Sequence, residues 1–178
     1  QIKNAALALE AASILENHFD FKLKENKVRT GLKKAFWPGR FERLKRQGRT
    51  FILDGAHNGA SMEELSRTLK HLYQGRPVCV IFGTSREKKL TDQLKPLLSR
   101  SHLLMITRSG NPRAQEPRVI LEAVHQFKFS RPTFLAGNLK EALKMAAQIA
   151  PKNAIVVITG SLFLVGEARQ ILRCPKFI

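Results

Sequence analysis

The feature that most constrains the fold is a regular alternation of short apolar runs with amphipathic segments along residues 50–172. Apolar runs predict strands at residues 50–54, 78–83, 103–107, 133–136 and 154–159, and helical spacing predicts helices at 61–73, 90–98, 118–127, 139–149 and 162–172. Nearly continuous apolar strands have to be covered on both faces. The alternation therefore predicts an α/β fold, with a mostly parallel sheet between two layers of helices.

The residues before this alternation differ in pattern. Residues 4–16 and 27–36 predict two helices that precede the sheet. A turn signal at Trp37-Pro38-Gly39-Arg40 leads into alternating residues 41–46, and Gly48 then predicts a tight turn into 50–54. We therefore predict an antiparallel hairpin strand on the N-terminal side of a Rossmann-like sheet. The predicted division is a helical segment, 1–36, and an α/β domain, 37–178.

Composition narrows the class of protein. Lys and Arg total 31 against 14 Asp and Glu, which gives a net charge of +17 at pH 7 and favours anionic partners. The basic residues occur in short groups rather than in one tract, as on a solvated surface. A helix needs about 18 apolar residues to span a bilayer, and no apolar run here approaches that length. Residues 1–10 do not resemble a signal peptide. The two cysteines form no metal or disulfide framework, so we expect a cytoplasmic protein.

Polar groups follow one predicted strand at once, in residues 51–59 (FILDGAHNG). Parallel strands end at the same edge of a sheet, which places Asp54, Gly83, Thr107 and Thr159 along one rim and predicts a binding site there. Asp54, His57 and Asn58 are the first candidates. The alternative is that Asp54 caps the next helix and His57 is a surface residue. No third nitrogen or sulfur ligand is spaced nearby, so no metal site is predicted.

Two further candidates are Ser161 and Arg40. Ser161 follows the last strand and opens a helix, where a hydroxyl and free N–H groups can bind an anion; it is also an ordinary N-cap type. Arg40 follows a turn and could clamp a phosphate, or be one of many solvated arginines. A Ser161, His57 and Asp54 triad has little support, because no Gly-x-Ser-x-Gly motif is present. Residues 109–117, with two prolines and a glycine, are the candidate for a mobile loop.

Three patterns in order, residues 37–42 (WPGRFE), 53–58 (LDGAHN) and 159–167 (TGSLFLVGE), resemble the folylpolyglutamate synthase/dihydrofolate synthase family of the Mur ligase superfamily. With residues 4–9 (NAALAL) they cover the whole chain, which is similar to the end of the family's central ATPase domain followed by its C-terminal domain. The resemblance implies an ATP-dependent carboxylate-amine ligase of folate biosynthesis and one-carbon metabolism. In that chemistry ATP phosphorylates a carboxylate, and the amine of L-glutamate attacks the acyl phosphate.

The resemblance also implies roles for single residues. Arg40, Asp54, His57 and Asn58 would bind ATP, His57 and Ser161 would bind glutamate, and His57 would be the catalytic group. ATP and Mg²⁺ are the implied cofactors, with the metal ligands mainly in the central domain. The chain departs from the family pattern at Gly59, where proline is usual and the helix start is expected to loosen, and at residues 85–89, whose role stays open.

The chain has no Gly-x-x-x-x-Gly-Lys-Ser/Thr sequence, so the phosphate cradle of such a ligase is missing from it. We expect a fragment of a longer ligase, inactive alone and monomeric in full-length form, with ATP, L-glutamate and dihydropteroate or folates as partners and no membrane. The sequence leaves open whether the enzyme makes dihydrofolate, extends polyglutamate tails or does both. The alternative is a basic nucleic-acid-binding α/β domain that uses Arg43, Arg46, Arg49, Lys88 and Lys89.

Overall fold

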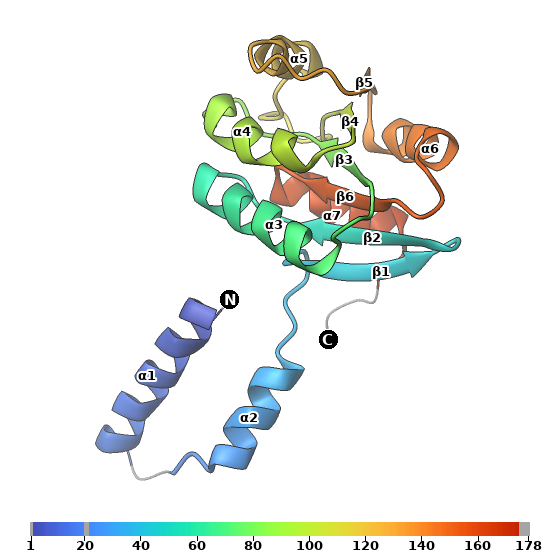
Figure 1. Cartoon of the computed structure of the whole chain (residues 1–178). Helices are drawn as coiled ribbons and strands as arrows, with labels where there is room; N and C mark the ends of the chain where they lie inside the picture. Colours follow the sequence, from blue (N-terminus) through green and yellow to red (C-terminus); the bar gives the residue numbers. More distant parts are fainter. Residues whose placement is uncertain (1, 20–21, 175–178) are drawn as a thin grey trace. The chain divides into compact units, whose positions relative to one another are not determined.

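The structure, a computed structural model, describes residues 2–19 and 22–174, without the side chains of residues 2 and 3. The chain divides into two compact units, Gln1–Trp37 and Pro38–Ile178. The first unit holds two helices, and the second holds the sheet with its covering helices. Figure 1 labels the elements of both.

The first unit contains α1 (Ile2–His18) and α2 (Glu25–Lys34). Both predicted helices are present, and each begins about one half turn earlier than the sequence indicated. Large apolar side chains of these helices remain exposed, with Leu7 at 70% and Ile14 at 51%, and α2 has no buried residue. Most helical stability in proteins comes from packing an apolar face, and this unit packs very little of its own apolar surface.

The second unit contains six strands and five helices among its described residues. The strands are β1 (Glu42–Arg46), β2 (Arg49–Asp54), β3 (Val78–Phe82), β4 (Leu103–Ile106), β5 (Thr133–Leu135) and β6 (Ile155–Thr159). The helices are α3 (Gly59–Leu72), α4 (Leu90–Arg100), α5 (Pro117–His125), α6 (Leu139–Ile149) and α7 (Leu162–Ile171). Every element predicted for this part of the chain is present, with ends that shift by two residues or fewer.

The sheet has the strand order β1-β2-β6-β3-β4-β5. The hairpin strand β1 pairs with β2 in antiparallel register, and the other pairs are parallel. The predicted fold class is therefore confirmed, including the antiparallel strand on the N-terminal side. Among the described residues, no helix is long and apolar enough to cross a membrane.

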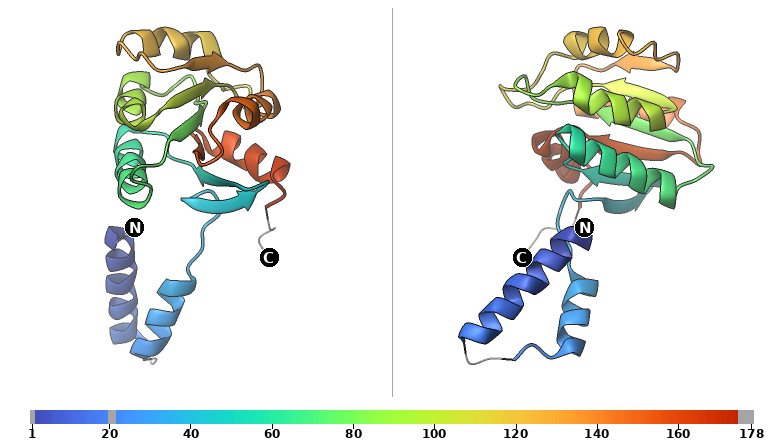
Figure 2. Two further views of the ribbon diagram at one scale, coloured as in Figure 1. Left: turned by 45° about the vertical axis from the view of Figure 1, so that its right-hand side comes forward. Right: turned by 60° about the vertical axis from the view of Figure 1, so that its left-hand side comes forward.

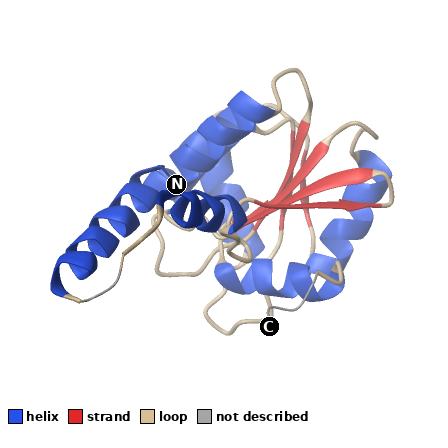
Figure 3. Ribbon diagram, turned by 90° about the horizontal axis from the view of Figure 1, so that it is seen from below, coloured by secondary structure: helices blue, strands red, loops and turns tan. Residues whose placement is uncertain are grey.

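The two faces of the sheet carry separate cores, and Figures 2 and 3 show helices on both faces. One face packs against α3, α4 and α5, with Ile52, Val80 and Leu104 facing that layer. The other packs against α6 and α7, with Leu53 and Ile81 facing it. Alternate residues of β2, β3, β4 and β6 serve opposite cores, which explains why these strands are apolar on both faces.

The topology directs attention to the end of β2 and β6. The chain leaves β2 for α3 on one face and leaves β6 for α7 on the other, so the connections diverge between these neighbouring strands. Such a divergence opens a crevice beyond the carboxyl ends of the strands, where open α/β sheets bind ligands. The register pairs Asp54 with Thr159 and Thr159 with Phe82, so the predicted rim is confirmed as one edge.

The loop of residues 109–117, which the sequence marks as the candidate for a mobile loop, is held by several bonds in this structure. Ser85 and Ala114 form an isolated bridge, and the Gln115 N–H donates to the Thr84 carbonyl at 2.7 Å. On its other side, the Gly110 N–H donates to Oε1 of Glu167 on α7 at 2.6 Å. The prolines and glycine shape this loop rather than free it, since its backbone groups find partners on two neighbouring segments.

Candidate functional site

Three loop segments meet at the carboxyl edge of β2 and β6: the Arg40 turn, the corner after Asp54 and the turn before α7. The Gly55 N–H donates to the Gly39 carbonyl at 2.7 Å, and the Gly160 N–H donates to the Ala56 carbonyl at 3.0 Å. These backbone bonds join the segments that carry Arg40, Asp54, His57, Asn58 and Ser161. The structure therefore gathers the loops of all five predicted site residues at one place on the rim.

Asp54 links the first two segments through both of its oxygens. Oδ2 accepts the Phe41 N–H at 2.8 Å, and Oδ1 accepts the Ala56 N–H at 2.9 Å. Burial raises the pKa of the Asp54 carboxyl above its usual 3.8, although these two N–H groups and the nearby Arg40 act in the opposite direction. In this structure, then, the carboxylate organises the loops around it.

The Arg40 turn has an unusual backbone on both sides of the arginine. Gly39 has φ +68° and Phe41 has φ +49°, values that favour glycine and cost a residue with a Cβ. The bond from the Phe41 N–H to Asp54 helps to hold that conformation. Arg40 is exposed between these two residues, so its guanidinium faces solvent at the rim.

His57 is half-buried and fixed through one ring nitrogen. Its Nδ1 lies 2.8 Å from the Gly55 carbonyl oxygen, and a carbonyl can only accept. Nδ1 therefore carries the proton, which leaves Nε2 for another partner. Within the described residues, Asp54 bonds backbone N–H groups and Ser161 Oγ accepts the Phe163 N–H at 3.2 Å. These three side chains form no hydrolase relay here.

Asn58, and not Asp54, is the N-cap of α3. Its Oδ1 accepts the Ser61 N–H at 2.9 Å, and Ser61 Oγ accepts the Asn58 N–H at 3.1 Å. This reciprocal capping box secures the helix start, so the loosening expected from Gly59 is offset. At position 59 a Cβ would lie 3.2 Å from Cβ of Asp92.

Ser161 is buried, with 6% of its surface exposed, and it caps α7. Its hydroxyl accepts from the Phe163 N–H, which leaves the hydroxyl hydrogen for a further acceptor. The first N–H groups of a helix carry a partial positive charge and bind anions readily. The start of α7 can thus receive a carboxylate or a phosphate beside the corner that holds His57.

Two residues of this region escaped the sequence interpretation. The alternating pattern of residues 41–46 predicts a strand without marking Glu42, yet Glu42 is 3% exposed and its Oε2 accepts the Gly39 N–H at 2.8 Å. Arg169 of α7 donates from Nε to the same Oε2 at 2.8 Å. In the alternating residues 41–46, no feature of the pattern other than its place in the alternation distinguishes Glu42. No local signal in the sequence points to Arg169.

Of the basic residues named for the alternative function, Arg49 and the two lysines lie at opposite ends of the strands. Arg49 donates to the carbonyls of Ala147, Ala150 and Pro151 at the end of α6, near the amino end of β2. Lys88 and Lys89 lie beyond the carboxyl end of β3, the fourth strand in the sheet order. These cations are therefore separated by the length of the strands. In the described part of the chain, no cluster of three His, Cys, Asp or Glu residues is arranged to hold a metal.

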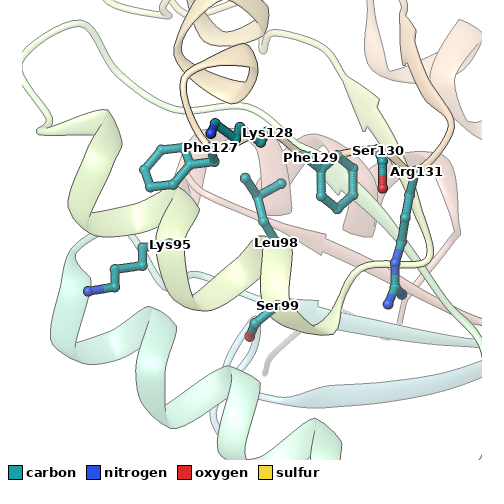
Figure 4. A pocket seen from close by; sticks show the side chains of 8 residues that line it. All are labelled: Lys95, Leu98, Ser99, Phe127, Lys128, Phe129, Ser130 and Arg131. Atoms are coloured by element: carbon teal, nitrogen blue, oxygen red, sulfur yellow. The ribbon is translucent and has the colours of Figure 1, made fainter.

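A shallow hollow of about 320 Å³ lies away from the rim, between α4 and the segment before β5. Figure 4 shows Phe127, Phe129 and Leu98 in its wall, with Lys95, Lys128 and Arg131 around them. Both phenylalanines pack against the core under α3 to α5, and Arg131 donates to the Ser101 carbonyl at 2.8 Å. The hollow thus belongs to the packing at the amino edge of the sheet, and none of the predicted site residues lines it.

Comparison with known proteins agrees with this arrangement. Residues 39–162 match the family described as Mur ligase, glutamate ligase domain. The chain is 30% identical over 173 residues to a dihydrofolate synthase/folylpolyglutamate synthase of Bacillus subtilis, which covers 97% of this chain and 39% of that protein. The chain therefore spans about two fifths of the length of this curated relative.

Solved structures show the same fold. A folylpolyglutamate synthase of Mycobacterium tuberculosis complexed with ADP aligns with a TM-score of 0.80 at 27% identity, over 88% of this chain and 37% of that one. A folylpolyglutamate synthase of Thermotoga maritima aligns with a TM-score of 0.76 at 32% identity, over 99% of this chain and 39% of that one.

Proposed function

Since the chain belongs to the family of Mur ligase glutamate ligase domains, we propose that it is the C-terminal module of an ATP-dependent folate-glutamate ligase. The proposed reaction joins L-glutamate through an amide bond to dihydropteroate or to a folate's glutamyl tail. The observation that carries the proposal is the joining of the Arg40, Asp54 and Ser161 segments by backbone bonds at the rim. Relatives named for both reactions leave the choice between the two activities open.

The groups at the rim suit a nucleotide and an amino acid. ATP, when bound, supplies the phosphoryl group that activates the accepting carboxylate. Arg40 is exposed and cationic, so it would neutralise phosphate charge, and Nε2 of His57 would contact phosphate or the incoming glutamate. Asn58 would approach the nucleotide with its amide nitrogen, because its Oδ1 is engaged by Ser61. Ser161 and the start of α7 would bind the glutamate carboxylate.

Asp54 needs a different emphasis from that of the sequence interpretation. The sequence interpretation makes Asp54 one of the residues that would bind ATP. The structure engages both of its oxygens with backbone N–H groups, so we propose that it binds ATP chiefly by shaping the Arg40 turn. Removing it leaves two partly buried N–H groups without acceptors, and we expect stability as well as activity to fall.

The magnesium ligands would lie on another part of the ligase. The described residues offer no carboxylate cluster for a metal, and the sequence lacks a P-loop with its metal-binding hydroxyl. We propose that α1 and α2 are the end of the central ATPase domain, a role that their exposed apolar side chains support. A cytoplasmic location and a monomeric full-length enzyme remain predictions.

The test is kinetic and uses the full-length ligase that carries this chain. Arg40→Ala should raise KM for ATP about tenfold, the effect of losing about 1.4 kcal/mol of phosphate binding. Arg43→Ala is the matched control, because Arg43 is an exposed arginine three residues away on β1. His57→Ala should lower kcat with little change in thermal midpoint. Wild-type kinetics for both Arg40→Ala and His57→Ala would refute the assignment of this rim.

A further inference from the structure

Glu42 is a buried carboxylate that makes two contacts with one oxygen. Its Oε2 accepts the Gly39 N–H and the Arg169 Nε–H, each at 2.8 Å. Its Oε1 is also buried and makes no hydrogen bond with the described residues. A buried charge is tolerated when it is paired and hydrogen-bonded, and Arg169 supplies that ion pair for Glu42 beneath the Arg40 turn.

Arg169 lies on the side of α7 that packs against the Arg40 turn. The residues at helical spacing before it, Leu162 and Val165, make the neighbouring contacts. A Cβ added to Gly39 would lie 2.6 Å from Cγ1 of Val165, and one added to Gly55 would collide with Leu162. Side chains from three successive turns of the helix α7 therefore contact the loop that presents Arg40 and the corner that follows Asp54.

The side chain of Arg40 has no comparable support of its own. It makes no hydrogen bond with the described part of the chain, so its guanidinium is placed by the backbone of its turn. That backbone is fixed by Glu42 at Gly39, by Asp54 at Phe41 and by the bond between Gly39 and Gly55. Glu42 therefore holds the residue before Arg40, and Asp54 holds the residue after it.

We propose that Glu42 and Arg169 are positioning residues for Arg40: the pair anchors the turn to α7, so that Arg40 meets the phosphates from a fixed backbone. The proposal rests on the proposed function, since it needs Arg40 at the nucleotide. It adds two residues that contact no substrate and act only through the turn. It also couples the nucleotide side of the rim to α7, whose N-cap is Ser161.

The test is a double-mutant cycle in the full-length ligase, with Arg169→Gln and Arg40→Ala measured alone and together. If Arg169 acts through Arg40, Arg169→Gln lowers kcat/KM for ATP about fivefold in the wild-type background, mainly through KM. In the Arg40→Ala background it should change that value less than about 1.5-fold. The loss of thermal midpoint should be the same in both backgrounds, which separates positioning from stability.

A second variant and a control complete the cycle. Glu42→Gln keeps an oxygen for the Gly39 N–H but weakens the attraction to Arg169, and the same cycle with it replaces the first where Arg169→Gln does not fold. Arg46→Gln is the matched control, since Arg46 binds the Leu172 carbonyl at the end of α7 without touching the turn. It should leave kcat/KM for ATP unchanged.

The outcomes separate the two proposals. If Arg40→Ala impairs the enzyme and Arg169→Gln then lowers kcat/KM for ATP by the full fivefold factor in that background, the positioning role alone is overturned. An Arg40→Ala enzyme with unchanged kinetics would instead remove Arg40 from the nucleotide site, and the positioning role would fall with it. Loss of the Arg169→Gln effect in the Arg40→Ala background supports both.

Discussion

A single carboxylate at the end of β2 contributes more to the structure than its sequence context suggested. Asp54 accepts one N–H from the turn before it and one from the corner after it, and burial raises its pKa. The same side chain therefore stabilises the loops through its bonds and costs free energy through its buried charge. Acidification tests the balance of these two effects, because it removes the charge and converts one of the two accepting oxygens to a hydroxyl.

The pH dependence of stability has a definite sign. A carboxyl whose pKa is raised in the folded state contributes stability that is complete below its unfolded pKa, near 3.8, and is lost as pH rises through the folded value. We expect the stability advantage of the wild-type chain over Asp54→Asn to be larger near pH 4 than at pH 7. Urea denaturation of both proteins across this pH range measures the difference directly. The contributions of the other titratable groups cancel, because the two proteins share them.

Asp54→Asn should also be destabilising at neutral pH, by about 1–3 kcal/mol, because an amide offers one acceptor where two N–H groups need one each. A difference between the two proteins that grows as pH rises would contradict the raised pKa. A difference near zero throughout would show that the two N–H bonds contribute nothing net.

At the scale of the element, the helix starts on the rim combine stability with binding. Asn58 caps α3 and Asn138 caps α6, each by accepting an N–H three residues ahead. Both are exposed, so they are chemically matched. Only Asn58 lies between the Asp54 corner and α3, where the nucleotide is proposed to bind.

This pair of caps allows structural and functional losses to be separated. Asn58→Ala and Asn138→Ala should each lower the free energy of unfolding by about 1 kcal/mol, the usual value of an N-cap. In the full-length ligase only Asn58→Ala should also weaken ATP binding, as measured by KM. Equal kinetics for the two variants would reduce Asn58 to a helix cap.

The contact between α7 and the Arg40 turn can be tested through glycines. Gly39 and Gly48 both have positive φ, at +68° and +72°, but only Gly39 faces a neighbour within 4 Å, namely Val165. Gly48→Ala should cost about 1 kcal/mol, the penalty of a left-handed alanine. Gly39→Ala should cost clearly more, since Val165 or the turn has to move. Chemical denaturation of both variants gives the comparison, and equal costs would mean that α7 does not press on the turn.

At the scale of the whole molecule, the proposed function makes the rim one side of an active site. Its cations, its imidazole and a helix start suit anions, but the chain has no P-loop and its described residues have no metal cluster. Phosphoryl transfer depends on positioning and charge neutralisation from all sides of the phosphates. A module that contacts the phosphates from one side needs the domain that contacts them from the other side to produce turnover.

The purified 178-residue chain should therefore release no phosphate from ATP and ligate no glutamate. The measurement is phosphate release and amide formation with folate, L-glutamate, ATP and Mg²⁺ present. The matching arm is the full-length ligase in the same assay. Turnover by the isolated chain that Arg40→Ala abolishes would show that this module holds a complete site.

The sequence by itself determined the fold class, the order of elements and the segments of the site, because these depend on local periodicity and short motifs. Short apolar runs such as 155–159 indicate buried strands. Asp54 is the last residue of one such strand, and Ser161 follows another after a single glycine. Tertiary structure alone decided what the side chains do there. Asp54 bonds Phe41 across 13 positions of the chain, and Glu42 pairs with Arg169 across 127 positions. Contacts at that separation arise when the sheet and α7 pack together, and no local pattern encodes them.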